Sequence, residues 1–199
     1  MKKTLLIIAL TLGLIYSVGG IYFYFFEKND KEKTENISEI KAFGYALKSN
    51  ATDLMKKEFE ILKENLESSA IDEEEYVTSV AKLFIIDVYT MSNKMNKYDV
   101  GGLNYVMPLG VENLKLNLTN TLYKYLENNI DGKRTQILPE VISITASDIE
   151  KTEMKIKNNI YNGYKIHLDW DYKKDLEYEK EAEVILIKDK EKYYIAEKK

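Results

Sequence analysis

The chain of 199 residues contains no cysteine, two prolines, one histidine and one arginine. The absence of cysteine excludes disulfide bonds, thiol catalysis, zinc–thiolate sites and lipid attachment to a cysteine. All 33 acidic residues and 27 of the 29 basic residues follow Phe26, so this part of the chain carries a net charge of −6. Nucleic acids are held largely through lysine and arginine contacts to phosphates, and this charge therefore argues against a nucleic-acid partner.

An uncharged apolar run fills residues 4–26, directly after two lysines. As a helix, its 23 residues would be about 34 Å long, enough to cross the roughly 30 Å hydrocarbon core of a membrane. A cleaved signal peptide is the alternative, because small residues stand at 17–20. However, the run stays apolar to its end, where two tyrosines suit the aromatic belt of a membrane surface. We therefore expect residues 1–26 to be a retained transmembrane anchor.

The flanks of this run favour a cytoplasmic amino terminus, because a short basic head is normally retained on the cytoplasmic side. After the run, residues 27–36 are charged or polar and predict a solvated spacer. The frequent lysine, asparagine and isoleucine, with a single arginine, are typical of an AT-rich bacterial genome. The sequence thus predicts a single-pass protein of the bacterial cell membrane, with its domain of residues 37–199 outside the cytoplasm.

The periodicity of apolar residues changes from helical to alternating near Asp131-Gly132. Before this point the spacing predicts three helices, one from Asp53, a buried central one from Asp72, and a third over about 110–128. Residues 37–49 suit either a helix or a short strand. After it, the alternation predicts strands over 141–147, 164–172, 178–188 and 193–197. The predicted fold class is α+β, with three helices packed on a curved four-stranded antiparallel meander.

The order of these elements, together with the terminal hairpin Val184–Ala196, resembles the nuclear transport factor 2-like superfamily. The resemblance covers about residues 53–199 and implies a cone of helices wrapped by a curved sheet. Bacterial members with one amino-terminal membrane helix and an external domain include scaffold subunits of type IV secretion and conjugation machines. The resemblance therefore implies an assembly role in a machine of this kind.

Candidate reactive groups are few. His167, Asp169 and Asp171 alternate with apolar residues, and we expect the apolar face to pack on the helices and His167 to face solvent. The stretch Asp99-Val100-Gly101-Gly102 could offer backbone amides to a phosphate, but a phosphate loop follows a strand, and here a helix precedes it. A turn at the mouth of the helical cone is the expected structure. The sequence accordingly predicts no catalytic residue, no metal site and no cofactor.

Tyrosine is abundant, with 16 residues. It combines apolar area with a polar hydroxyl and is common at protein contact surfaces. The candidate partner or pocket surface comprises Tyr89, Tyr98, Tyr105, Tyr161 and Tyr193, with packing in the core as the alternative. We expect a non-catalytic docking or assembly protein whose external domain binds membrane or envelope proteins, and self-association is compatible with this role. The alternative function is an external binding domain for a small molecule or a cell-wall fragment.

Overall fold

The structure is a computed structural model that describes residues 36–199. The predicted anchor of residues 1–26, and all of the predicted spacer except Asn36, lie outside the described residues. Among the helices within 36–199, none is both long and apolar enough to span a membrane.

The described elements, in chain order, are a short hairpin, two long helices, a loop with two 3-10 turns, a third helix and four strands. Their bounds are β1 Asn36–Ile40, β2 Tyr45–Lys48, α2 Asp53–Glu67, α3 Glu73–Tyr89, η1 Leu103–Tyr105, η2 Pro108–Gly110, α4 Val111–Asn120, β3 Val141–Ile156, β4 Asn159–Tyr172, β5 Glu181–Asp189 and β6 Lys192–Lys198.

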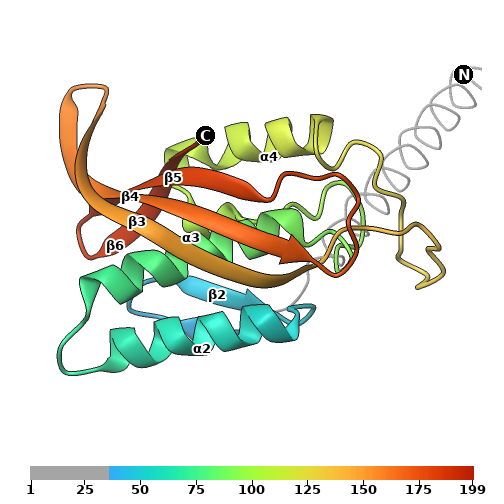
Figure 1. Cartoon of the computed structure of the whole chain (residues 1–199), viewed down its shortest axis with the longest axis horizontal. Coiled ribbons are helices and arrows are strands. Elements are labelled where there is room, and N and C mark those ends of the chain that lie inside the picture. Colours follow the sequence, from blue (N-terminus) through green and yellow to red (C-terminus); the bar gives the residue numbers. More distant parts are fainter. Residues whose placement is uncertain (1–35) are drawn as a thin grey trace, which may run out of the picture. The chain divides into compact units, whose positions relative to one another are not determined.

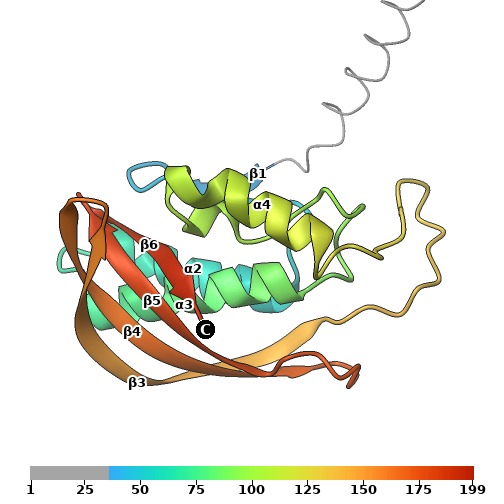
Figure 2. The same cartoon turned by 90° about the horizontal axis from the view of Figure 1, so that it is seen from above.

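The four long strands form one antiparallel sheet in the order β3-β4-β5-β6 (Figure 1). The sheet curves around α3, and all four of its strands contact this helix. In Figure 2, α3 lies between the sheet and α4, and α2 packs against α3. The predicted α+β fold, with three helices and a four-stranded antiparallel sheet, is confirmed.

Helix α3 forms the centre of the domain. It begins after Asp72, whose carboxylate accepts hydrogen bonds from the amides of Glu74 and Glu75 at 2.9 and 3.0 Å. Such a cap satisfies amides that the first helical turn leaves unpaired. Every residue from Leu83 to Tyr89 is buried, as expected for a helix that is apolar on nearly every face.

Strands β3 and β4 extend beyond their predicted bounds, which were 141–147 and 164–172. Past Gly163, where the pairing of β4 with β5 ends, the two strands continue as a two-stranded ribbon. Most residues of this ribbon are exposed, and the apolar residues that alternate along its β3 half are only partly buried, so the ribbon lacks the buried face of a strand packed on a core. A Cβ atom at Gly163 would lie 1.9 Å from the carbonyl oxygen of Leu186, so glycine is required where the ribbon leaves the sheet.

Residues 37–49 adopt the strand alternative, whereas the third helix is shorter than predicted. Residues 37–49 hold the hairpin of β1 and β2, which pair as a separate two-stranded sheet. The third helix ends at Asn120 and does not continue to residue 128. Beyond its end, Tyr123 is fully buried, and its hydroxyl donates a 2.7 Å hydrogen bond to the carbonyl of Val88. This long-range contact turns the chain away from the helical path that its apolar spacing suggests.

Candidate functional site

An open groove lies between α4 and β6, with α3 beneath it. It consists of two cavities of about 470 and 440 Å³. Both are lined by Phe84, Leu114, Asn117 and Lys198, so they adjoin and form one elongated feature, called here the α4–β6 groove. The groove is bounded mainly by α3, α4 and β6, and Ile156 and the loop at Tyr178 also line it.

The lining of the α4–β6 groove is apolar in its depth and polar along its margins. The apolar side chains come from α3, α4, β6 and the loop before α4; they include Phe84, Val88, Val106, Leu114, Leu118 and Ile195. Polar side chains come from the exposed side of α4, the turn after it, the loop before β5 and the end of β6; they are Asn113, Asn117, Thr121, Glu179, Glu197 and Lys198. An apolar lining of this kind favours a ligand with apolar side chains.

The groove remains open because α4 covers the core only in part. None of the ten residues of α4 is buried, although Leu114 and Leu118 pack against the core with one side. Leu109, in the turn before the helix, also lines the groove and is 62% exposed, and Leu116 on the helix is 65% exposed. The helix therefore presents more apolar surface than the described domain covers.

One end of the groove contains a cluster of paired charges. The ammonium of Lys198 donates to both oxygens of Glu179, at 2.9 and 2.8 Å, and the hydroxyl of Tyr89 donates to the same carboxylate. Burial and the hydrogen bond to Glu179 raise the pKa of Tyr89. Burial alone would raise the pKa of Glu179, but its bonds to Lys198 and Tyr89 outweigh burial and lower it. The charges at this end therefore neutralise one another.

The five candidate tyrosines do not form one surface. Tyr89 lines the groove, with 6% of its surface exposed. Tyr105 and Tyr193 are buried in the core, Tyr98 is 64% exposed in the loop after α3, and Tyr161 lies on the ribbon of β3 and β4. Only Tyr89 of the five therefore belongs to the α4–β6 groove.

The buried tyrosines form an aromatic cluster that joins the β1–β2 hairpin to the sheet. Tyr45 stacks on Tyr105 with ring centroids 5.9 Å apart, and Tyr193 meets Tyr76 edge-on at 5.0 Å. The hydroxyl of Tyr45 donates a 2.6 Å hydrogen bond to the carbonyl of Tyr193. Burial raises the pKa of Tyr45, Tyr105 and Tyr193. These contacts satisfy the polar groups inside the cluster and give it a packing role.

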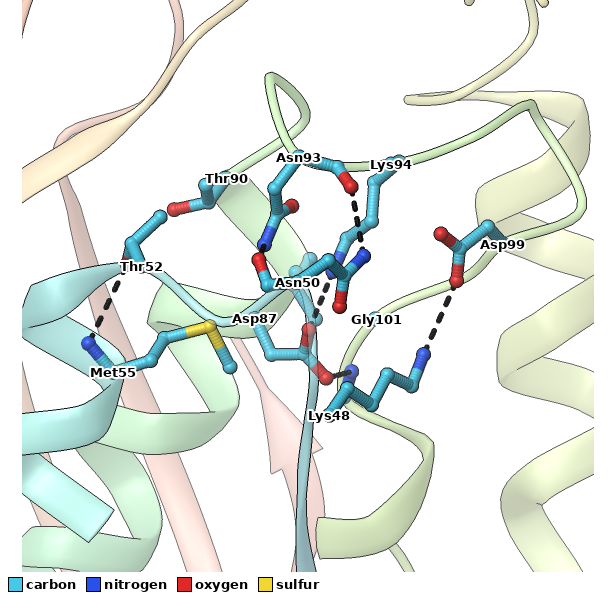
Figure 3. Close-up of polar contacts among 12 residues, drawn as sticks. Lys48, Asn50, Thr52, Met55, Asp87, Thr90, Asn93, Lys94, Asp99 and Gly101 are labelled. Carbon is cyan, nitrogen blue, oxygen red and sulfur yellow. Dashed lines mark hydrogen bonds and ion pairs between the residues drawn. The ribbon is translucent and has the colours of Figure 1, made fainter. Parts of the chain in front are cut away.

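A buried ion pair fixes the loop between α3 and α4 (Figure 3). The ammonium of Lys94 lies 2.5 Å from a carboxylate oxygen of Asp87, and neither side chain is more than 6% exposed. Lys48 is paired with Asp99 at 3.2 Å in the same region. Burial alone would raise the pKa of Asp87, but the charges of Lys94 and Lys48 outweigh burial and lower it. The pairing keeps Asp87 charged inside the core.

The glycine pair belongs to this buried network. The amide of Gly102 donates to Asp87 at 2.7 Å, and the amide of Gly101 donates to the hydroxyl of Tyr123 at 3.3 Å. A Cβ atom at Gly101 would lie 1.9 Å from the carbonyl oxygen of Asp87. The amides that a phosphate would need are thus already used, and the close approach of the loop to α3 explains the glycine. Sequence reasoning missed Asp87 itself, although a single acidic residue within the apolar stretch Leu83–Tyr89 was a signal of a buried partner.

His167 lies on the outer face of the sheet, with a third of its side chain exposed. Trp170, on the opposite face of the same strand, is 3% exposed and packs against Tyr89 with ring centroids 5.0 Å apart. The Nε2 atom of His167 lies 3.4 Å from Asp169 and 4.0 Å from Glu181 on β5. The group around the imidazole therefore includes Glu181, which the sequence pattern of β4 alone could not reveal.

Comparison with known proteins gives no relative from which a function could be transferred. No family model matches the chain, and no curated protein or solved structure matches it significantly. The resemblance to the nuclear transport factor 2-like superfamily accordingly stays a prediction.

Proposed function

We propose that this protein is a non-catalytic, membrane-anchored docking protein. In this proposal residues 1–26 cross the bacterial cell membrane, and the external domain binds an apolar segment of another membrane or envelope protein in the α4–β6 groove. The observation that carries the proposal is the groove itself, an apolar channel left open along a helix whose residues are all at least partly exposed. A secretion or conjugation machine is the kind of assembly to which the family resemblance points.

The shape of the groove supports a chain segment as its occupant. Two adjoining cavities that share four lining residues make an elongated space, which suits several consecutive side chains better than one compact molecule. Leu109 and Leu114 would contact such a segment, because both line the groove and neither is buried. Contacts of this kind stabilise the complex because they remove apolar surface from water.

The charges of the groove support an apolar segment over a charged one. Lys198 is already paired with Glu179, and Glu197 lies 3.8 Å from the ammonium of Lys199. A charged ligand would therefore meet groups that are neutralised within the domain. Anchoring to the membrane would raise the local concentration of both partners, so a weak individual contact would be sufficient.

Site-directed photo-crosslinking in native membranes tests the proposal. A photoreactive amino acid at Asn117, which lines both cavities, should form an adduct with a specific envelope protein. The matched control position is Thr145, which is exposed on β3 and pairs with Asp169 on the sheet. We expect the adduct from position 117 and not from position 145.

A second pair of variants connects the adduct to the groove. Leu109→Glu places a charge at the groove margin and should abolish the adduct, whereas Ile142→Glu, at a site 51% exposed on β3, should leave it unchanged. Equal adducts from both photoreactive positions, or an adduct that survives Leu109→Glu, would contradict docking in the groove.

A small molecule is the second candidate occupant, because cavities of 300 to 1,000 Å³ are typical of ligand sites. The two parts of the groove, about 470 and 440 Å³, fall in this range. Native mass spectrometry of the purified full-length chain distinguishes the candidates. A bound mass that Leu109→Glu removes, without any protein adduct from position 117, would favour the small molecule or cell-wall fragment.

A further inference from the structure

Three potential metal ligands meet on the outer face of the sheet, away from the α4–β6 groove. They are the imidazole of His167 and the carboxylates of Asp169 and Glu181, and one ligand atom from each lies within 4.8 Å of the other two. Among residues 36–199 this is the one group of three or more such side chains close enough to hold an ion.

The pairing of β4 with β5 explains why the three side chains meet. His167 and Asp169 are two residues apart and therefore lie on the same face of β4. In the register of the sheet, Glu181 on β5 lies directly opposite Asp169. Both carboxylates approach the same atom, because Nε2 of His167 lies 3.4 Å from Asp169 and 4.0 Å from Glu181.

The electrostatics of this position are unusual for the sheet. Asp169 and Glu181 are like charges placed directly across two strands, an arrangement that destabilises strand pairing. On the same face, Glu150 and Glu183 both lie within 4 Å of the Lys165 ammonium. For Asp169 and Glu181, the ion-pairing partner observed among the described residues is His167, whose charge depends on protonation. A divalent cation would supply the positive charge that lysine supplies to the neighbouring carboxylates.

We propose that His167, Asp169 and Glu181 form a binding site for a divalent transition metal that joins β4 to β5. One nitrogen and two carboxylate oxygens suit Zn²⁺, which takes such ligands at about 2.0 to 2.2 Å in tetrahedral geometry, with water in the fourth position. Around such an ion the ligand atoms lie roughly 3.3 to 3.6 Å apart. The 3.4 Å separation of His167 and Asp169 already matches this spacing, and a small rotation of the exposed Glu181 side chain would bring its oxygen to the same distance.

The composition of the chain makes the site directly testable. It has no cysteine and no other histidine, so the usual competing ligands for Zn²⁺ are absent. The experiment is isothermal titration of the tag-free, full-length chain in detergent with Zn²⁺, together with thermal unfolding with and without the ion. We expect one ion per chain and a higher unfolding temperature in its presence, because the ion binds the folded sheet.

Two variants and one control decide the result. Loss of an outer-shell partner of a metal ligand alone weakens affinity by about 10- to 100-fold, so His167→Ala and Glu181→Gln should each weaken binding at least as much and abolish the thermal shift. Glu153→Gln, at an exposed carboxylate elsewhere on the sheet, should change neither. Affinity that is unchanged in either ligand variant, or is equally weakened in Glu153→Gln, would overturn the proposal. Binding of Zn²⁺ by no form of the chain would overturn it as well.

Discussion

Lys94→Met is the substitution that best tests the buried ion pair. The side chain of Lys94 is fully buried, and its ammonium lies 2.5 Å from Asp87, whose side chain is 6% exposed. Methionine fills a similar volume but leaves the carboxylate with the Gly102 amide at 2.7 Å and the more distant charge of Lys48. Breaking a buried pair on one side costs about 3 to 5 kcal/mol, because a charge remains buried without its partner. This is a large part of the roughly 5 to 15 kcal/mol that stabilises a typical domain.

Urea unfolding of the full-length chain, followed by the fluorescence of Trp170, measures this cost. The chain has one tryptophan, and it is 3% exposed, so its emission reports on the core. The matched control is Lys180→Met, which breaks the ion pair of Lys180 with Asp175 at 2.7 Å, where the side chains are 45% and 65% exposed. An exposed pair contributes about 0 to 1 kcal/mol. If Lys94→Met lowers the free energy of unfolding by no more than Lys180→Met does, then burial does not make the Lys94–Asp87 pair important for stability.

The same variant should change the response to acid. The pKa of Asp87 is lower in the folded chain than in the unfolded chain, where a carboxyl of this type titrates at about 3.9. Its contribution to stability is therefore complete above that pH and is lost as the pH falls through the lower folded-state pKa. Lys94→Met removes a cause of the lowering, so unfolding in acid should begin at a higher pH than in the wild type.

Three further predictions concern the core, the glycine turn and the topology. Trp170→Ala should cost about 3 to 5 kcal/mol in urea unfolding, whereas His167→Ala without added metal should change stability by less than about 0.5 kcal/mol; the reverse order would refute the facing of β4. Gly101→Ala should lower the unfolding temperature sharply, because its Cβ atom would lie 1.9 Å from the carbonyl oxygen of Asp87, and an unchanged temperature would show that the loop can move away from α3. Protease added to intact protoplasts should digest the external domain, and protection until lysis would contradict the proposed orientation.

The sequence predicts those elements in which a regular pattern of apolar residues matches a buried face. Helix α3 could be recognised because Asp72 caps its start and nearly every position in its second half is apolar. The facing of β4 could be recognised because a strict alternation requires Trp170 and His167 to lie on opposite faces. In both cases the local pattern and the tertiary environment agree.

The remaining features depend on contacts between distant segments. The end of α4 is decided by Tyr123, whose hydroxyl bonds to the carbonyl of Val88, and no local signal after Asn120 encodes that contact. The α4–β6 groove likewise depends on how far α4 stands from Phe84, which apolar spacing does not reveal. Glu181 joins His167 only through the register of two strands. Periodicity reports which face of an element is apolar, and it does not report what covers that face.

The two edges of the sheet differ in a way that favours the proposed docking on the side of β6. The free edge strand β3 has two register shifts, near Val141 and after Ser147, and its outer half carries alternating charges. Bulges and charges of this kind prevent further strands from adding to a sheet. Along the outer edge of β6, Ile195 forms a parallel bridge with Val106, and the backbone of Tyr193 is bonded to the hydroxyls of Tyr45 and Tyr76. The residues that follow Ile195 line the apolar groove. In the proposed docking, a partner segment would therefore be held by the apolar lining beside the end of β6, because the edge of the strand at Tyr193 and Ile195 already has partners within the domain.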